Sequence, residues 1–490
     1  MTESEFYALA SQGYNRIPCV FETLADFDTP LSIYVKLANE PYSYLLESVH
    51  GGERFGRYSF IGLSTPTRIA VYGNQTMVLT GDRVAEKAPE NMNPLAFIRQ
   101  YLARYQVAKV PKLPRFAGGL VGCFGYDTIA YIEPKLAHSR HTDTLSLPDI
   151  YLLVSEEIAV VDNLTGKLML IIYADPEVPN AFQKAKKRME ELLQRLISHA
   201  SIPEATQYPA QTPVEETCQA DFEAAVRKAK EYIFEGDIMQ VVLSQRLSQP
   251  FYADPLTLYR ALRAINPSPY MYYYHFDDFH VVGTSPEILV RLEGEDVTVR
   301  PIAGTRKRSA NLAEDEHLAE EMLNDPKEIA EHTMLLDLGR NDLGKIAQPA
   351  TVTVDEHMVI ERYSHVMHMV SNVTGKLKPS EDAISVFKAT FPAGTVSGAA
   401  KIRAMEIIDE LEVSKRGLYA GAVGYLGFHG DMDLAITIRT AIIRNNTIYV
   451  QAGAGIVADS DPASEWTETL NKAKAVLKAA NMAMNGLKDE

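Results

Sequence analysis

The chain has 490 residues, and its 48 Lys and Arg stand against 64 Asp and Glu, which leaves a formal net charge of −16. At about 150 residues per domain this length predicts roughly three domains. The apolar fraction of 46% is ordinary for a globular protein with a sizeable core. An acidic surface repels nucleic-acid phosphates and anionic lipids, so both are poor candidates for partners. The charge is compatible with binding a metal cation or a basic partner.

The cysteines and the N-terminus indicate the redox environment and the compartment. Cys19, Cys123 and Cys218 lie far apart without Cys-x-x-Cys spacing, so we expect neither a disulfide framework nor a zinc or redox motif. Residues Met1–Glu5 lack the basic and apolar regions of a signal peptide. No apolar run approaches the ~20 residues that a membrane-spanning helix needs. We therefore expect a soluble, cytoplasmic protein.

A proline-containing connector divides the chain. Residues 201–214 hold three prolines and show no apolar periodicity, which is typical of a surface linker. They follow a charged stretch, 180–199, that has a helical pattern. We predict an N-terminal part over 1–200 and a longer C-terminal part over 215–490.

The C-terminal part begins with an amphipathic helix, because apolar residues recur at helical spacing over 222–233 and Gly236-Asp237 ends the pattern. Strand-like runs and hairpin turns follow, then long helical patterns from Ala313 onward, then strands again. The predicted strands are 238–247, 270–276, 280–283, 288–293, 297–302, 419–428, 436–444 and 447–453. Strands that are joined by hairpins and grouped apart from the helices predict an α+β fold with mainly antiparallel sheets.

Two helices of this part begin with the same signal, an Asp N-cap followed by Pro at the first helical position. The signal occurs at Asp325-Pro326 and at Asp461-Pro462. Each helix then carries two glutamates at i,i+3 spacing, which places both on one helix face. The pairs are Glu328 with Glu331 and Glu465 with Glu468, and Lys472 lies one turn beyond Glu468.

The two glutamate pairs have several interpretations. Most Glu-x-x-Glu pairs on helices are simply solvated, and Glu328 at the third helical position is also placed for a capping role. Alternatively, the two helix faces meet around one Mg²⁺, which takes one or two carboxylates and keeps positions for water and an anionic substrate. A di-iron site is less favoured, because neither helix carries a Glu-x-x-His pair. The spacing alone leaves these interpretations open.

Two glycine-containing stretches, Pro301–Thr305 and Gly453–Gly455, end predicted strands. Glycine lets backbone N–H groups approach an anion closely, although an isolated Gly-x-Gly is more often a turn or a bulge. His368 lies in an apolar strand-like stretch, where a lone His is more often a core residue than a catalyst. Arg439 lies in the predicted strand 436–444 and is either a surface residue or a fork for a substrate carboxylate.

Five motifs occur in one order along residues 215–490: Pro301–Thr305, Glu328–Asp342, Val366–Ser371, Phe391–Lys401 and Gly453–Lys472. In these motifs and their order the chain resembles the chorismate-utilising enzymes, and most closely the large subunits (component I) of anthranilate synthases. The resemblance implies antiparallel sheets packed as a sandwich with helices outside. It also implies amination of chorismate followed by loss of pyruvate, a step of tryptophan biosynthesis.

Two positions distinguish the members of this family. Relatives that add water to chorismate carry a lysine base where this chain has Gln240, and aminodeoxychorismate synthases typically carry a nucleophilic lysine where it has Ala303. Without both lysines, neither water activation nor covalent attack on the ring has its catalyst. Ammonia needs no deprotonation to attack, so this pattern is that of an anthranilate synthase.

The resemblance also implies a set of site residues around Mg²⁺ and chorismate. The implied metal ligands are Glu331 and Glu468, with Glu328 and Glu465 as outer partners. The implied chorismate-binding residues are Gly304, Thr305, Tyr419, Arg439, Gly453, Ala454 and Gly455. The implied catalytic residues are Glu287 as the acid for the departing C4 hydroxyl, His368 as the helper in pyruvate loss, and Thr395 and Lys472 as supporting contacts.

A second match lies partly in the N-terminal part and resembles the tryptophan feedback site of the family. It consists of Leu45–Ser48 and Asn266–Met271. By this resemblance, residues 1–200 form a regulatory part that contributes to the site, and the effector would contact Ser48, Pro269, Tyr270 and Met271. The segment that follows, Val49–Arg54, differs from some members of the family.

No cysteine lies in a Gly-x-Cys-x-Gly nucleophile turn, so the chain lacks a glutaminase of its own. The resemblance implies a separate glutamine amidotransferase subunit, in a heterotetramer of two large and two small chains. The alternatives are an aminodeoxyisochorismate synthase, which stops before pyruvate loss, an aminodeoxychorismate synthase, or a catalytically silent amino-acid sensor.

Overall fold

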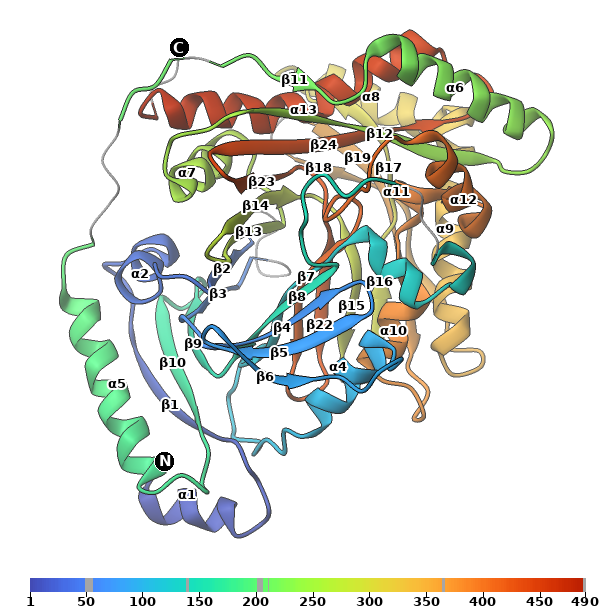
Figure 1. Ribbon diagram of the computed structural model, residues 1–490. Coiled ribbons are helices and arrows are strands. Elements are labelled where there is room, and N and C mark those ends of the chain that lie inside the picture. The colour runs from blue at the N-terminus through green and yellow to red at the C-terminus, as the bar shows by residue number, and fades with distance from the viewer. Residues whose placement is uncertain (49–55, 138–140, 201–205, 210, 364–365, 488–490) are drawn as a thin grey trace.

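The computed structural model describes residues 1–48, 56–137, 141–200, 206–209, 211–363 and 366–487. Within these residues the strands form two twelve-stranded sheets, and paired strands run antiparallel. Figure 1 shows the sheets in the middle of the molecule, with α5 along one side and α13 and α6 along another. The predicted α+β class with mainly antiparallel sheets is confirmed.

The first sheet and the second sheet have different strand orders. The first runs β1 (Ile17–Leu24), β10 (Lys167–Ala174), β9 (Glu157–Asp162), β3 (Tyr58–Gly62), β2 (Ser43–Glu47), β13 (Tyr270–His275), β14 (Phe279–Ser285), β23 (Thr440–Arg444), β24 (Thr447–Ile456), β12 (Gln240–Pro250) and β11 (Val214–Glu215), with β20 (Gly398–Ala399) on β12. The second runs β17 (Ile302–Lys307), β19 (Val366–Lys376), β16 (Asp296–Val299), β15 (Ile288–Glu293), β22 (Met432–Ile436), β21 (Ala422–Gly427), β7 (Gly119–Phe124), β8 (Ile150–Ser155), β4 (Thr67–Tyr72), β5 (Gln75–Thr80) and β6 (Arg83–Lys87), with β18 (Thr353–Arg362) on β19.

Helices pack against the outer faces of the sheets. The α-helices are α1 (Glu3–Ala10), α2 (Pro30–Leu37), α4 (Pro94–Ala103), α5 (Ala181–Ile197), α6 (Gln219–Phe234), α7 (Pro255–Ile265), α8 (Leu312–Asn324), α9 (Pro326–Ile346), α10 (Ala383–Thr390), α11 (Gly394–Ser397), α12 (Lys401–Leu411) and α13 (Pro462–Met484). Two short 3₁₀ helices, η1 (Tyr126–Tyr131) and η2 (Pro134–Leu136), follow β7.

Strand β13 explains how the layers are held together. Successive side chains of a strand point to opposite faces. Met271 and Tyr273 therefore join a core with α2, α5, α7 and α13, whereas Tyr272 and Tyr274 join the core between the two sheets. All four side chains are at most 2% exposed. The apolar run thus becomes a central strand that is buried on both faces.

Strands from the two predicted parts of the chain share both sheets. In the first sheet β2 of the N-terminal part pairs with β13 of the C-terminal part, and in the second β7 pairs with β21. In Figure 1 the blue strand β2 accordingly lies beside β13 of the C-terminal part. Residues 1–200 and 215–490 therefore fold together, and each sheet requires both. Residues 201–205 and 210, within the connector, lie outside the described residues.

Several predicted elements differ from the structure at their ends. The helix predicted over 222–233 is α6, which ends before Gly236 as predicted. The predicted strand 297–302 is wrong as a single strand, because β16 ends at Val299 and β17 begins at Ile302. The predicted strand 436–444 is also wrong: β22 ends at Ile436, β23 begins at Thr440, and the chain between them turns.

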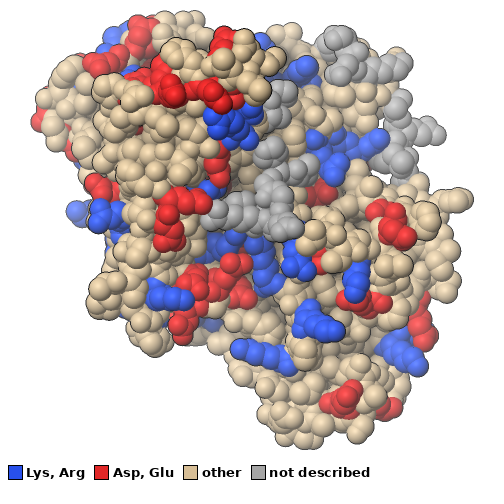
Figure 2. Space-filling model, turned by 180° about the vertical axis from the view of Figure 1, so that it is seen from behind, with Lys and Arg blue, Asp and Glu red and all other residues tan. Residues whose placement is uncertain are grey.

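Figure 2 shows Lys and Arg side chains interleaved with Asp and Glu over the face seen from behind. None of the helices in the described ranges combines the length and apolar character that a membrane crossing requires.

Candidate active site

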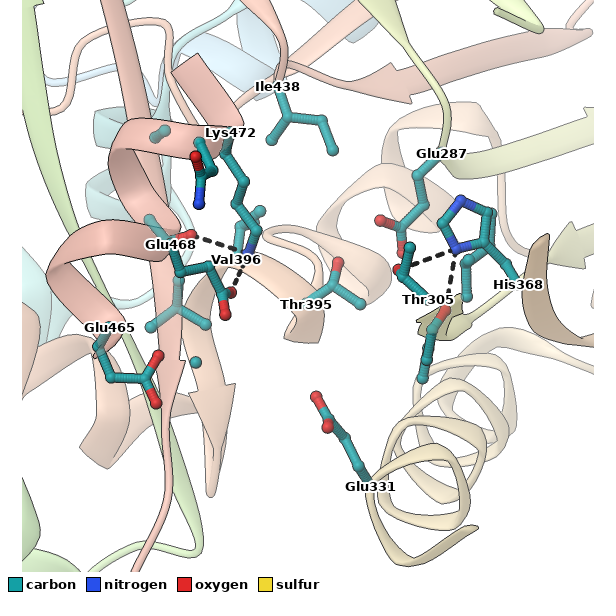
Figure 3. A pocket seen from close by; sticks show the side chains of 18 of the residues that line it. Glu287, Thr305, Glu331, His368, Thr395, Val396, Ile438, Glu465, Glu468 and Lys472 are labelled. Atoms are coloured by element: carbon teal, nitrogen blue, oxygen red, sulfur yellow. Dashed lines mark hydrogen bonds and ion pairs between the residues drawn. The ribbon is translucent and has the colours of Figure 1, made fainter. Parts of the chain in front are cut away.

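One cavity of about 1170 Å³ collects most of the predicted site residues. Its walls come from β12 and β24 of the first sheet, β17 and β19 of the second, and helices α9, α11 and α13. Figure 3 shows side chains from these elements pointing into one shared space. The predicted residues that line the cavity are Glu287, Gly304, Thr305, Glu328, Glu331, His368, Thr395, Tyr419, Arg439, Gly453, Gly455, Glu465, Glu468 and Lys472.

The helices α9 and α13 begin where the sequence indicates. The carboxylate of Asp325 accepts a hydrogen bond from the Lys327 N–H at 2.9 Å, and that of Asp461 accepts one from the Ser464 N–H at 2.9 Å. These caps satisfy N–H groups that otherwise lack a helical partner. Both helices direct their first turns toward the cavity, and Figure 3 shows Glu331 and Glu468 approaching it from different sides.

The four glutamates have different partners. Glu331 accepts a hydrogen bond from the amide of Gln240 at 3.2 Å, whereas Glu468 forms an ion pair with Lys472 at 2.7 Å. Glu328 binds Arg306 at 2.8 Å, which is an ion pair rather than the capping contact that its position allows. Burial raises the pKa of Glu465, and the nearby Glu468 carboxylate adds to the rise.

The placement of these glutamates suits one kind of divalent cation. Within the described residues no group of three or more His, Cys, Asp or Glu is placed to hold a metal by itself. Mg²⁺ typically uses one or two carboxylates and fills its other positions with water and substrate oxygens. Glu331 and Glu468, facing one cavity from two helices, therefore fit Mg²⁺ better than they fit a metal that needs a complete protein cage.

Glu287 lies between β14 and β15, where the chain crosses from one sheet to the other, and is 8% exposed. Burial raises the pKa of its carboxyl group to about 8; the Thr395 hydroxyl and the Lys472 ammonium act in the opposite direction without reversing the shift. A carboxyl group with this pKa is protonated at neutral pH, so it can donate a proton.

His368 points from β19 toward Gly304 and Thr305 of β17. Its Nδ1 lies 2.9 Å from the Gly304 carbonyl oxygen and 3.1 Å from the Thr305 hydroxyl. A carbonyl oxygen only accepts, so Nδ1 carries the proton and Nε2 is left as the basic nitrogen. Burial lowers the pKa of the imidazole, which keeps the ring neutral at neutral pH. The Tyr363 ring packs edge-on against it, with centroids 5.6 Å apart.

Arg439 occupies the turn between β22 and β23 with a left-handed φ of 51°. In the part of the chain that the structure describes, its guanidinium makes no side-chain hydrogen bond or ion pair. Burial lowers its pKa, opposed by Tyr419 and Glu468. A cation that lines a cavity without a protein partner is a site for an anionic group.

Close contacts explain the glycines of β24. A Cβ at Gly453 would lie 2.6 Å from the Tyr419 hydroxyl, and one at Gly455 would lie 2.7 Å from the Gln240 amide nitrogen. Both side chains can therefore reach the cavity only because these positions lack a Cβ. Lys472 extends over the same strand and donates to the Gly453 carbonyl at 3.0 Å.

Ala454 is the predicted chorismate-binding residue that does not line the cavity. It is fully buried in the core around the second sheet, because side chains alternate along β24. Sequence reasoning also missed residues that do line the cavity, among them Lys307, Lys327, Gln451 and Asn471. Asn471 and Lys327 had a usable signal, since Asn471 lies at i+3 from Glu468 on α13 and Lys327 lies four residues before Glu331 on α9.

A second, small cavity of about 50 Å³ brings together the predicted effector residues Ser48, Pro269, Tyr270 and Met271. Its polar end is a network in which the Tyr270 hydroxyl donates to Asp433 at 2.9 Å and Arg291 donates to the same tyrosine oxygen at 3.1 Å. The segment Val49–Arg54 lies outside the described residues. The predicted effector residues are thus neighbours in space although Ser48 is remote in sequence.

Known proteins resemble this chain over nearly its whole length. The chorismate binding enzyme family matches residues 42–478. Anthranilate synthase component 1 of Neisseria meningitidis is 55% identical over 490 residues, and that of Pseudomonas aeruginosa is 55% identical over 488, each alignment covering 99% of both chains. The crystal structure of anthranilate synthase component I from Streptococcus pneumoniae TIGR4 has a TM-score of 0.78 and 37% identity, covering 93% of this chain and 99% of that one. The chain therefore belongs to the chorismate binding enzyme family.

Proposed function

We propose that the chain is the large subunit of an anthranilate synthase, which converts chorismate and ammonia to anthranilate and pyruvate. The observation that carries the proposal is the composition of one cavity. It joins two facing glutamates, a guanidinium that has no side-chain partner among the described residues, and a buried carboxyl group whose pKa is raised to about 8. A dianionic substrate that must lose a hydroxyl group needs these three elements.

We assign Glu331 and Glu468 as the residues that hold Mg²⁺, and Glu328 and Glu465 as outer partners. When bound, the ion neutralises the ring carboxylate and draws electron density from the ring. The enolpyruvyl carboxylate is assigned to Arg439 and Tyr419, with the backbone around Gly304, Thr305, Gly453 and Gly455 completing the binding site.

The first chemical step is amination. The nitrogen of ammonia forms a bond to ring C2, the ring double bonds shift, and the C4–O bond breaks. Glu287 gives its proton to the departing hydroxyl, which leaves as water, and Thr395 lies beside this carboxyl group. The excess proton on the new amine passes to solvent or to the Glu287 carboxylate.

The second step is the loss of pyruvate. Nε2 of His368 removes the proton from C2, the ether C–O bond at C3 breaks, and the ring becomes aromatic. Enolpyruvate leaves with the ether oxygen and becomes pyruvate. Lys472, which binds both Glu468 and the Gly453 carbonyl, supports this end of the site.

Ammonia is favoured over water as the nucleophile. The amide of Gln240 donates to Glu331, so the position that holds a base in water-adding relatives holds a hydrogen-bond donor here. Ala303 is buried and carries no nucleophile. Both observations support amination rather than hydration or covalent attack.

We further propose that ammonia comes from a separate glutamine amidotransferase subunit, in a cytoplasmic heterotetramer. Burial raises the pKa of the Cys123 thiol above its usual range and that of Cys19 to about 11, so neither forms a thiolate readily. Cys218 is exposed, and its thiol donates to Asp221 at 3.0 Å. We assign tryptophan as a feedback inhibitor that binds the second cavity.

The test is a fluorescence assay of the purified chain with chorismate, Mg²⁺ and ammonium chloride, with and without tryptophan and with glutamine as a separate nitrogen source. We expect anthranilate fluorescence that EDTA abolishes, that tryptophan suppresses and that glutamine alone does not support. Chorismate consumed without fluorescence would indicate an aminodeoxyisochorismate or aminodeoxychorismate synthase, which product chromatography separates. Chorismate left intact while tryptophan binds would indicate a sensor.

A further inference from the structure

We propose that the buried ion pair between Arg416 and Glu412 is a positioning element for the chorismate-binding end of the cavity. This inference rests on the proposed function and adds to it two residues that touch neither substrate nor metal. Both side chains are buried, at 1% and 6% exposure, and neither lines the catalytic cavity as described. Any effect on chorismate must therefore pass through the residues that they hold.

The guanidinium of Arg416 joins two walls of the cavity. Its Nε donates to Glu412 at 2.8 Å, and Nη2 donates to the other carboxylate oxygen at 2.6 Å. Nη1 donates to the carbonyl of Val396 at 2.7 Å, and Nη2 to that of Val242 at 2.7 Å. Val396, which follows Thr395 in α11, and Val242 of β12 both line the cavity.

The same guanidinium supports Tyr419. It lies 5.5 Å from the centre of the Tyr419 ring and 4.7 Å from that of Tyr126, so two aromatic rings contact one cation. The Tyr419 hydroxyl in turn packs on Gly453 of β24, where no Cβ fits. A shift of Arg416 would therefore move the tyrosine that we assign to the enolpyruvyl carboxylate.

The carboxylate of Glu412 is linked by hydrogen bonds to a further residue of the cavity wall, Gln451, through Ser244. Its Oε1 accepts hydrogen bonds from the backbone N–H and the hydroxyl of Ser244, both at 2.8 Å. The Ser244 oxygen accepts another from the Gln451 amide at 2.9 Å, and Gln451 lines the cavity. The pair thus connects β12, β24, α11 and the Tyr419 turn through one hydrogen-bonded network.

The test is a double-mutant cycle between Arg416→Lys and Tyr419→Phe. Lysine keeps the charge but replaces a rigid fork of donors by one ammonium group, whose three N–H donors cannot reproduce the four hydrogen bonds of the guanidinium. We measure KM and kcat with ammonium chloride, and the Kd for chorismate with Mg²⁺ but without ammonium by calorimetry. We expect Arg416→Lys to raise KM and Kd about tenfold with a smaller change in kcat. In the Arg416→Lys background, Tyr419→Phe should raise Kd by a smaller factor than it does in the wild type.

Arg16→Lys is the matched control, because Arg16 is also an ion-paired arginine beside a tyrosine: it binds the carboxylates of Glu156 and Asp175 and lies 5.2 Å from the centre of the Tyr105 ring. It does not line the cavity, so we expect a lower Tm without a change in Kd. Equal effects of Arg16→Lys and Arg416→Lys on Kd would overturn the proposal. It would also be overturned if the effects of Arg416→Lys and Tyr419→Phe on Kd multiply independently in the double variant.

Two further outcomes, a variant that does not fold and a failure of the proposed function, can be distinguished from a failure of this proposal. If Arg416→Lys does not fold, Ser244→Ala keeps the ion pair and removes one hydrogen bond to Glu412; a Kd equal to that of the wild type would then count against the network. A wild-type chain that binds chorismate without forming anthranilate would overturn the proposed function, while the Kd cycle would still decide the role of Arg416.

Discussion

Nδ1 of His368 lies 2.9 Å from the carbonyl oxygen of Gly304, which leaves Nε2 as the basic nitrogen of this ring. We predict that His368→Ala slows anthranilate formation by about 100-fold, because removal of the C2 proton loses its base. The aminated intermediate should accumulate, and chromatography of the products should show it. His317→Ala, at an exposed position of α8, is the control. Unchanged pyruvate release in His368→Ala would remove the assignment.

Glu287 should impose an alkaline limit on the rate. Its pKa is raised to about 8, and only the protonated carboxyl can donate, so kcat is supported below that pH and falls as the pH rises through it. The rate must be measured at a constant concentration of neutral ammonia, since this also changes with pH. Glu287→Gln should lower kcat by about 100-fold and abolish the fall of kcat at alkaline pH. A variant with the wild-type profile would show that another group is the acid.

The glutamates assigned to hold Mg²⁺ and those assigned as outer partners should differ in their effect on metal dependence. We predict that Glu331→Gln and Glu468→Gln each raise the Mg²⁺ concentration for half-maximal rate by at least about tenfold, because each removes a charged ligand. Glu328→Gln should have a smaller effect, since Glu328 binds Arg306. Calorimetric Mg²⁺ titration in the presence of chorismate gives an activity-independent measurement. The reverse order of effects would exchange the inner and outer roles.

Feedback should be separable from catalysis. We predict that Ser48→Ala raises the tryptophan concentration for half-inhibition by at least about fivefold, with kcat unchanged, because Ser48 lines the second cavity and not the catalytic one. Ser64→Ala, exposed on the same part of the chain, is the control. Inhibition curves at fixed chorismate check this, and equal inhibition of both variants would place the effector elsewhere.

Local signals in the sequence were sufficient for the helices that carry the glutamates. Asp325 and Asp461 cap α9 and α13 as predicted, because an Asp-Pro start acts within one turn. The i,i+3 spacing likewise placed each glutamate pair on one helix face. The pattern could not tell that Glu328 pairs with Arg306, because Arg306 lies on β17, 22 residues earlier in the chain.

The backbone conformation of Arg439 could not be predicted from the local sequence. Its surroundings have the β-forming pattern of one continuous strand, yet the chain turns there with a φ of 51°. L-residues rarely adopt this conformation unless the rest of the fold imposes it. Here β22 lies in the second sheet and β23 in the first, so the chain must change sheets within three residues.

The sequence by itself determined the α+β class, the starts of the acidic helices and, through motif order, the chemistry expected of the chain. Only the tertiary structure decided that Glu331 and Glu468 face one cavity, that burial raises the pKa of Glu287 to about 8, and that residues 1–200 share both sheets with 215–490. The physical reason is the distance along the chain over which each kind of interaction acts. Caps, turns and side-chain periodicity act within a few residues, whereas burial and facing positions depend on contacts between segments that are far apart in the chain.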